Sequence, residues 1–246
     1  MTQSWAQELA EAWQRTAPRP VKADPKISIE EAYGTQKAFV ELRGDPIAGY
    51  KAGLTSHAAQ QAQGLASPVS GVLFKSVRFE SGAEIESSLM GIPLIETEIG
   101  FLVGRDVTSP VSRETVSAAL AAFIPMVEIV DVSFSERPIA TDIIACNVAA
   151  AYYIESQSRH DIARVNDVGL CLYADGELKH KGAATDALGD QLEAAAWLIN
   201  QTLDQGYAVR AGQVLMTGSL GAVCPGRPGN YRVDYGEFGE ILFSLK

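Results

Sequence analysis

A predicted β-strand over residues 94–103 places the strongest constraint on the fold. It reads Leu-Ile-Glu-Thr-Glu-Ile-Gly-Phe-Leu-Val, an apolar strand with two acids in its middle. Side chains alternate faces along a strand, so Glu96 and Glu98 point the same way. Two like charges on an otherwise apolar strand are costly unless a cation lies between them. The strand alone allows two interpretations: a site for a divalent cation such as Mg²⁺, which prefers oxygen ligands, or an edge strand with a solvated acidic face.

Composition and charge exclude several classes of protein. The chain has 246 residues, 47% of them hydrophobic, and a net charge of −10. Its length and apolar content suit one large domain, alone or with a small lobe. The acidic balance argues against binding of nucleic acid or of anionic lipid. No apolar stretch is long enough to span a membrane, and no signal peptide is visible. Three cysteines without CxxC spacing make a disulfide framework or structural zinc site improbable, so we expect a reduced, cytoplasmic protein.

An N-terminal helical lobe is predicted for residues 1–45. Apolar residues recur at helical spacing over residues 2–16. Ser28 and Glu31 have capping-box spacing, and a second helical pattern follows to about Leu42. Gly44-Asp45-Pro46 then ends it. Residues 46–246 form the predicted catalytic domain.

Residues 46–246 are expected to be rich in short strands. Strands are predicted near residues 47–51, 71–74, 123–132, 168–173, 177–181, 213–217 and 240–245, among others, with helices over 112–122 and 187–205. The strands outnumber the helices and do not alternate with them as βαβ units. The sequence therefore predicts an α+β fold, with a mixed or antiparallel sheet folded on itself.

A third acid, Glu128, lies in the apolar stretch 123–132. Glutamate is almost never fully buried without a partner. One interpretation is a buried ion pair with an arginine or lysine. The other is a third metal ligand beside Glu96 and Glu98, which would give three oxygen ligands and leave positions for water or substrate.

An ordered set of motifs resembles the 2-keto-4-pentenoate hydratase / 2-oxo-3-hexenedioate decarboxylase family of the fumarylacetoacetate hydrolase superfamily. The motifs are Gly-Tyr-Lys-Ala-Gly-Leu-Thr at 49–55, Glu-Thr-Glu-Ile-Gly-Phe at 96–101, Gly-Arg-Asp at 104–106, Glu-Ile-Val-Asp at 128–131 and Leu-Met-Thr-Gly-Ser at 215–219. The resemblance covers nearly the whole chain, including the N-terminal helices. It implies a fumarylacetoacetate-hydrolase-like fold and an enzyme that acts on small 2-oxo acids of aromatic catabolism.

The resemblance also implies roles for particular residues. Glu96, Glu98 and Glu128 match the family's ligands for Mg²⁺ or Mn²⁺. Lys51 matches a catalytic lysine near the substrate, with Leu54 in the same motif as a substrate contact. The loop of Thr217, Gly218 and Ser219 matches one that holds the substrate carboxylate through hydroxyl and backbone N–H groups. Taken without the family, Lys51 would be an ordinary surface lysine and the loop a polar turn.

Two departures concern the proton-transfer groups. Hydratases of this family usually carry an acid after the strand that ends here in Leu73-Phe74, where this chain has Lys75 and Ser76. They often carry Asp-Asn followed by serines, where this chain has Cys146-Asn147-Val148-Ala149-Ala150. These changes bear on the hydration step more than on the metal site.

The hydrolase branch of the superfamily offers a second comparison. It has a His-x-x-Glu pair that activates water and a lysine after a Leu-Phe strand. Here His57 and Lys75 match, but Gln60 replaces the glutamate, and a neutral amide cannot stabilise a protonated histidine as a carboxylate does. His57, Lys75 and Lys51 are therefore the candidate proton carriers, with a surface position as the other interpretation of His57.

Four functions follow from the sequence. The leading one is a metal-dependent lyase that hydrates 2-hydroxypenta-2,4-dienoate (2-oxopent-4-enoate). The alternatives are a 2-oxo-3-hexenedioate decarboxylase, an acylpyruvate-type C–C hydrolase, and a weakly active paralogue that serves as a partner subunit. The resemblance further implies a homo-oligomer, with a related hydratase or decarboxylase as a possible partner, and no nucleic-acid or membrane partner.

Overall fold

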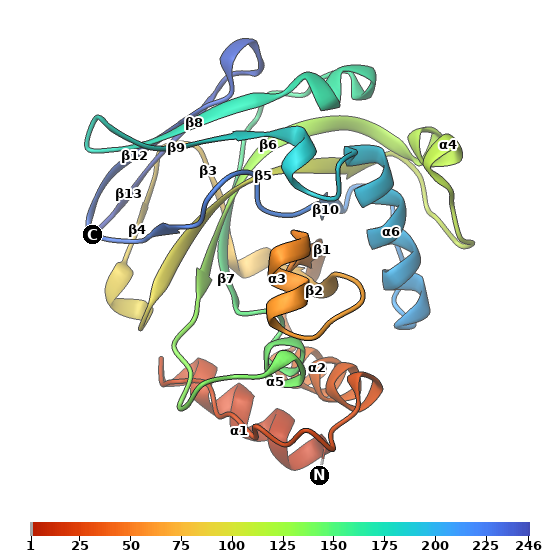
Figure 1. Ribbon diagram of the computed structural model, residues 1–246, viewed down its shortest axis with the longest axis vertical. Helices are drawn as coiled ribbons and strands as arrows, with labels where there is room; N and C mark the ends of the chain where they lie inside the picture. The colour runs from red at the N-terminus through yellow and green to blue at the C-terminus, as the bar shows by residue number, and fades with distance from the viewer. Residues whose placement is uncertain (1) are drawn as a thin grey trace.

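The computed structural model describes residues 2–246 (Figure 1). Its α-helices are α1 (Thr2–Gln14), α2 (Ile29–Arg43), α3 (His57–Ala62), α4 (Arg113–Val116), α5 (Ala140–Ala145) and α6 (Gln191–Asp204). Its strands are β1 (Ile47–Gly53), β2 (Val69–Phe74), β3 (Arg78–Glu80), β4 (Ala83–Ile85), β5 (Pro93–Val103), β6 (Leu120–Asp131), β7 (Ala150–Glu155), β8 (Gly169–Ala174), β9 (Glu177–Ala183), β10 (Val214–Met216), β11 (Cys224–Pro225), β12 (Gly229–Asp234) and β13 (Glu240–Leu245). The predicted α+β class is confirmed.

Two mixed sheets make up the β-rich part. The larger sheet has the order β2-β1-β10-β5-β6-β7-β3, and β11 also pairs with β5. The smaller sheet has the order β4-β13-β12-β8-β9. The β1–β10, β3–β7 and β4–β13 pairs are parallel and the others antiparallel. The sequence predicted a single folded sheet, whereas the chain divides its strands between two.

The larger sheet is strongly curled. In a flat sheet, β1 would lie about 14 Å from β6, because three strand spacings separate them. Instead, Nζ of Lys51 on β1 lies 2.5 Å from a carboxyl oxygen of Glu128 on β6. The side chains on the concave face therefore meet in the middle of the curl, although they belong to strands that are not neighbours. Figure 1 shows β5 and β6 as the long strands that run through this curl.

The N-terminal helices pack beneath the curled sheet, together with α5 (Figure 1). Ser28 and Glu31 form the predicted capping box of α2. Trp5 and Leu9 of α1 are buried with Phe39 of α2, and burial of each such side chain contributes about 1.5–3 kcal/mol. Buried Gln36 donates to the carbonyls of Ser70 and Ile144, both at 2.9 Å, and so joins α2 to β2 and α5.

The predicted helix over residues 112–122 is largely wrong. Only Arg113–Val116 is α-helical, a 3₁₀ turn covers Ser117–Ala119, and β6 begins at Leu120. The alanines favour a helix locally, but Ala122 pairs with Leu102 at the end of the long β5–β6 ladder. Strand pairing and burial thus override a weak helical propensity. The helix predicted from residue 187 begins at Gln191 instead, because the Asp190 side chain caps the N–H groups of Leu192 and Glu193.

Smaller features agree with the sequence. Asp175 and Gly176 have φ of 49° and 82° in the predicted β8–β9 hairpin, as a type I′ turn requires. Cys146, Cys171 and Cys224 are all free. No helix among residues 2–246 is both long and apolar enough to cross a bilayer.

Gly49 offers a test of the β1–β10 pairing. A Cβ at this position would overlap the carbonyl oxygen of Val214, a backbone atom of the neighbouring strand. We expect Gly49→Ala to lower the free energy of unfolding by about 1–3 kcal/mol, the usual cost of overpacking. Urea denaturation would measure it. Gly34→Ala is the matched control, because that Cβ would meet only Thr2 at 3.8 Å inside a helix, where alanine is favoured. Equal stability of the two variants would contradict the packing of β1.

Candidate functional site

Three carboxylates converge on the concave face of the curled sheet. Glu96 and Glu128 lie directly opposite each other in the β5–β6 ladder, and Glu98 lies two residues further along the same face. Ligand atoms of the three lie within 4.8 Å of one another. Glu98 and Glu128 have no exposed surface, while Glu96 is half-buried. The register of one antiparallel pair thus assembles the three predicted metal ligands.

Lys51 lies against the same group of acids. Its Nζ donates to both carboxyl oxygens of Glu128, at 2.5 and 2.6 Å, and to the carbonyl of Val148 at 3.1 Å. The side chain is 1% exposed. Glu128 therefore satisfies both interpretations of the sequence, since it is in a buried ion pair and also belongs to the three-carboxylate group. One ammonium faces three carboxylates, which leaves an excess of negative charge.

The excess of negative charge shifts the pKa values of these groups. Burial raises the pKa of Glu98 well above its usual range, and the neighbouring charges of Glu128 and Glu96 raise it further. Burial also raises the pKa of Glu96 and of Glu128, while Lys51 opposes both shifts. Burial acts to lower the pKa of Lys51, but the attraction of Glu128 and Glu96 outweighs it and the net shift is upward. A further cation is what this site electrostatically lacks.

The donor set fits a hard divalent cation. Oε2 of Glu98 accepts a hydrogen bond from the Gly218 N–H at 2.7 Å, but Oε1 is buried with no partner among residues 2–246. An orphaned carboxylate oxygen in an apolar interior is costly unless a ligand uses it. Carboxylate oxygens are the ligands that Mg²⁺ and Mn²⁺ prefer. Glu96, Glu98 and Glu128 can therefore hold such an ion and leave positions for substrate.

The loop after β10 closes one side of the site. Thr217 Oγ1 lies 2.9 Å from the Ile99 carbonyl and 2.5 Å from Oε1 of Gln191, so its hydroxyl is used inside the protein. The Gly218 N–H is bound to Glu98. Ser219 Oγ is buried and has no partner in the described chain. Of the hydroxyl and amide groups expected to hold a substrate carboxylate, Ser219 is the one left available.

Close packing explains the glycine in that loop. Gly218 has φ of 117°, and a Cβ there would overlap the side chain of Thr55, which follows β1. Leu54, the neighbour of Thr55, is half-buried and also left-handed, with φ of 54°. The end of β1 and the loop after β10 therefore meet, because β1 and β10 are parallel neighbours and end at the same edge of the sheet.

A strained segment supports Lys51. Asn147, Val148 and Ala149 have φ of 61°, 53° and 56°, three consecutive left-handed residues. Each such residue costs of order 1–3 kcal/mol unless the surroundings hold it. The Asn147 side chain accepts from the Val72 N–H at 2.7 Å and donates to the Val72 carbonyl at 2.9 Å, which locks the segment onto β2. The Val148 carbonyl is thereby fixed on Lys51.

Two buried residues at the site were missed from the sequence. The Tyr235 hydroxyl contacts the carbonyls of Glu98 at 3.1 Å and Met126 at 2.5 Å, and so fixes β5 against β6 beside the acids. Gln191, fully buried at the start of α6, accepts from Thr217 and donates to the Ala184 carbonyl at 2.6 Å. The sequence shows Gln191 only as a polar residue after Asp190, which caps α6, and nothing there indicates that it is buried.

His57 and Lys75 lie outside this group. His57 is the first residue of α3 and is exposed. Gln60 does not orient it, because its amide donates to the Thr55 carbonyl at 3.4 Å. Lys75 is exposed in the turn after β2, where its N–H donates to the Pro46 carbonyl at 2.9 Å. The structure thus brings Lys51 to the three glutamates and leaves the other two candidate proton carriers at the surface.

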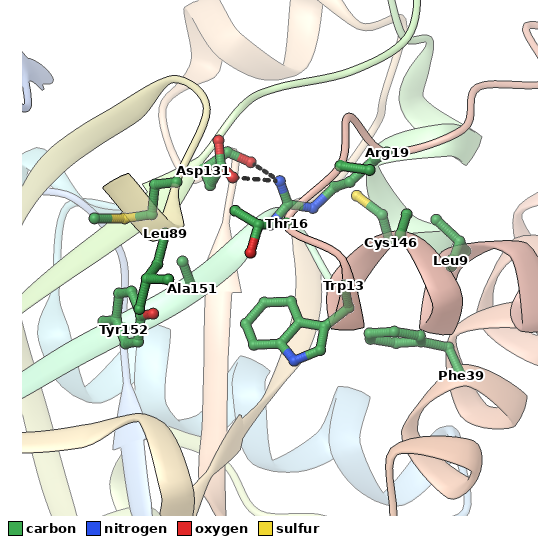
Figure 2. Close-up of a pocket in the computed structure, with 13 residues that line it drawn as sticks. Leu9, Trp13, Thr16, Arg19, Phe39, Leu89, Asp131, Cys146, Ala151 and Tyr152 are labelled. Atoms are coloured by element: carbon green, nitrogen blue, oxygen red, sulfur yellow. Dashed lines mark hydrogen bonds and ion pairs between the residues drawn. The ribbon is translucent and has the colours of Figure 1, made fainter. Parts of the chain in front are cut away.

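Cavities lie between the helical lobe and the sheet. One of about 130 Å³ is bounded by Trp13, Phe39 and Tyr152, with the buried Arg19–Asp131 ion pair on its wall (Figure 2). A smaller one of about 10 Å³ lies between Glu128 and Arg43, and Ala151 and Tyr152 line both. Of the three acids, only Glu128 lines either cavity.

Comparison with known proteins identifies the family, although no family model matches the chain. The sequence is 31% identical to a 2-keto-4-pentenoate hydratase of Paraburkholderia xenovorans (strain LB400), over 92% of this chain and 87% of the relative. It is 30% identical to the 2-oxo-hept-4-ene-1,7-dioate hydratase of Escherichia coli, over 96% and 94%. It is 27% identical to a 4-oxalocrotonate decarboxylase of Pseudomonas sp. (strain CF600), over 91% and 87%.

Solved structures agree on the fold. The 4-oxalocrotonate decarboxylase of Pseudomonas putida G7, complexed with magnesium and adipate, superimposes with a TM-score of 0.94 at 25% identity, over 100% of this chain and 97% of that one. The fumarylpyruvate hydrolase of Pseudomonas aeruginosa, with Mn²⁺ and pyruvate, gives 0.58 at 13% identity, over 82% and 90%, which shows the fold alone.

Fold and acid group together define a member of the fumarylacetoacetate hydrolase superfamily. Within it, the chain belongs to the family of the 2-keto-4-pentenoate hydratases and 4-oxalocrotonate decarboxylases, which are lyases. The resemblance drawn from the ordered motifs is confirmed.

Glu98→Gln tests the site without an activity assay. Because burial and like charges raise the pKa of Glu98, its ionised form costs stability at neutral pH, above its ordinary pKa. We expect the variant to raise the Tm of the metal-free protein by about 2–4 °C, as a gain near 1 kcal/mol would do. Mn²⁺ should raise the Tm of the unaltered protein, by binding only the folded state, but not that of the variant. Calorimetry with and without Mn²⁺ measures both.

Glu155→Gln is the matched control. Glu155 is also buried with a raised pKa, caused by burial, but it pairs with Arg78 at 2.6 Å away from the three acids. The Mn²⁺-induced rise in Tm should persist in this variant. A Mn²⁺ response in Glu98→Gln as large as in Glu155→Gln would contradict the metal site.

Proposed function

We propose that this protein is a Mg²⁺- or Mn²⁺-dependent lyase for small 2-oxo acids of aromatic catabolism, and that it hydrates 2-hydroxypenta-2,4-dienoate. One observation carries the proposal: Glu96, Glu98 and Glu128 converge in a buried site that holds one lysine and an orphaned carboxylate oxygen. Hydratases at 31% and 30% identity over most of the chain support the reaction class.

Each part of the site has a role in this reaction. A divalent ion held by the three glutamates would polarise the substrate's C2 oxygen and favour enolate charge. Lys51, charged and hydrogen-bonded to Glu128, can give and take a proton beside that oxygen. Ser219 can donate its free hydroxyl to the substrate carboxylate, and the packed Leu54 and Thr217-Gly218 backbone shape the pocket around it. Lys75 and His57 remain proposed proton carriers, and both require movement of an exposed segment.

Decarboxylation of 2-oxo-3-hexenedioate is the alternative with a specific observation behind it. The chain superimposes over its full length, with a TM-score of 0.94, on a decarboxylase bound to magnesium and adipate. Loss of CO₂ from such an acid needs the same enolate-stabilising site but no acid to activate water. This chain has Lys75 and Ser76, not an acid, after β2, which is compatible with a reaction that needs no activated water. A C–C hydrolase has less support, since no carboxylate orients His57. No specific observation favours a weakly active partner subunit.

The proposal extends to assembly and location. We place the protein in the cytoplasm as a homo-oligomer, alone or with a related hydratase or decarboxylase subunit. The three free cysteines are compatible with a reducing compartment. We also divide the chain into a helical lobe, residues 1–45, and a catalytic domain, residues 46–246. The end of α2 at Arg43 and the start of β1 at Ile47 support that boundary.

Product analysis separates the candidate reactions. With Mg²⁺, we expect loss of 2-hydroxypenta-2,4-dienoate absorbance without release of CO₂. Release of CO₂ from 2-oxo-3-hexenedioate would favour the decarboxylase, and pyruvate plus a free acid from an acylpyruvate would favour the hydrolase. Glu96→Gln and Glu128→Gln should each abolish the metal-dependent rate, because each removes a charged ligand. An unchanged rate with undiminished Mg²⁺ dependence in either variant would refute the assignment of ligands.

Lys51→Met tests the proton step. Methionine fills the buried space but carries no proton, so we expect kcat to fall by about 10²–10⁴-fold, the usual contribution of general acid–base catalysis. Mn²⁺ binding, measured by calorimetry, should persist, because all three glutamates remain. His57→Ala and Lys75→Ala provide the comparison. A greater loss of kcat in either of them than in Lys51→Met would move the proton step away from Lys51.

A further inference from the structure

The cavity of about 130 Å³ beneath the helical lobe is separate from the metal site. Asp131, on its wall, follows Glu128 by three residues on β6, and the β5–β6 register is unbroken between them. Side chains an odd number of residues apart on a strand point to opposite faces. The cavity therefore lies on the face of the sheet that meets the helices, whereas the three glutamates lie inside the curl.

Arg19 is held at the wall of this cavity by its backbone. It stands between Pro18 and Pro20, which restrict the chain to an extended form. Its N–H donates to the Ser133 carbonyl at 2.8 Å, and its carbonyl accepts from the Ser135 N–H at 2.9 Å. The side chain is 10% exposed and contacts Asp131, as Figure 2 shows. The guanidinium is thus a fixed feature of the cavity.

Asp131 leaves much of that guanidinium unused. Its Oδ1 accepts from the N–H groups of Ile92 at 2.9 Å and Ser133 at 3.1 Å. Its Oδ2 accepts from the Gly91 N–H at 3.2 Å and contacts Nη1 of Arg19 at 3.3 Å. Both oxygens are therefore fully used. Nη1 also donates to the Asp131 carbonyl, but Nε and Nη2 make no hydrogen bond in the part of the chain that the structure describes. The polar capacity that this pair leaves free consists of donors.

The other walls suit a single aromatic ring. Trp13, Phe39 and Tyr152 all line the cavity, and ring-to-ring contacts favour an aromatic occupant. A cavity of about 150 Å³ is known to hold one benzene molecule, which is close to the volume found here. Leu89 also lines the cavity and is 54% exposed, so it lies at the opening to solvent.

These two features together select the ligand. A neutral ring would leave the N–H groups of Nε and Nη2 unpaired, which is costly in an enclosed site. A carboxylate without a ring would leave the apolar volume unfilled. An aromatic acid satisfies both, because Nε and Nη2 form one edge of the guanidinium and can donate in parallel to the two oxygens of a carboxylate.

We propose that this cavity binds a small aromatic monocarboxylate, whose carboxylate pairs with Nε and Nη2 of Arg19 and whose ring lies among Trp13, Phe39 and Tyr152. The site needs neither a metal ion nor turnover, so the inference does not rest on the proposed function. Its occupant contacts α1, α2 and β7 at once and should stabilise the folded state.

The test compares benzoate with benzamide, a neutral molecule of nearly the same shape. Titration calorimetry uses the Mn²⁺-loaded protein. We expect benzoate to bind at least about 10-fold more tightly than benzamide, because hydrogen bonds to a charged partner are the stronger ones. Acetate, which lacks the ring, should bind at least about 10-fold more weakly than benzoate. Glu98→Gln should bind benzoate within about threefold of the unaltered protein, because distant sites act independently.

Arg19→Met removes the donors but keeps an apolar stem, so benzoate should bind this variant no better than benzamide does. Arg43→Met is the matched control. The Arg43 guanidinium lies over the Trp13 ring at 3.9 Å, but Arg43 does not line this cavity, and the preference for benzoate should persist. Ala12→Leu supplies a variant that leaves Arg19 intact. Ala12 lines the cavity from α1, and leucine there should abolish benzoate binding while the Mn²⁺-induced rise in Tm remains.

Three results would each overturn the proposal. The first is equal binding of benzoate and benzamide, or no binding of either. The second is a preference for benzoate that survives both Arg19→Met and Ala12→Leu. The third is loss of benzoate binding in Glu98→Gln, which would place benzoate on the metal ion.

Discussion

The Lys51–Glu128 contact is the interaction on which the site depends. It joins strands that lie three positions apart in the sheet order, at 2.5 Å, and therefore exists only because the sheet is curled. Removing two charges from water costs several kcal/mol for each ion, and one close pair rarely regains it all. Here the ammonium also meets the Val148 carbonyl, while Glu96 and Glu98 add attraction from the same side. The curl brings Lys51 to the acids, and the ion pair with Glu128 holds it there.

The same contact explains why a metal and a lysine can share Glu128. A carboxylate has about four lone-pair directions, and the lysine uses one on each oxygen. Glu98 uses one for the Gly218 N–H and leaves Oε1 free. The lysine therefore holds part of the acidic group in place without neutralising it. Such an arrangement trades stability for a preformed site, as expected where charges of one sign are held together for binding.

The glutamates could be found from the sequence because alternation along a strand is a local rule. Glu96 and Glu98 share a face by spacing alone, and Glu128 stood out as an acid in an apolar stretch. Lys51 could be assigned only through the family, since nothing local predicts that β1 curls over β6. The helix predicted over the alanine-rich residues 117–122 was wrong because a non-local contact, the pairing with β5, determines their conformation. Tyr235 and Gln191 act through backbone carbonyls and a hydroxyl of distant segments, which leaves no periodic trace in the sequence.

The acids and the segments around them are held in place in different ways. The β5–β6 ladder fixes the acids through backbone register, so substitutions elsewhere hardly alter which oxygens meet. The strained turn at 147–149 and the residues after β2 lie on segments held by a few side-chain bonds, such as Asn147 to Val72 and Ser76 to Asp45. Those segments can change residue without disturbing the ladder. A fold of this kind can keep its group of carboxylates while the segments around that group change, so the two can vary independently.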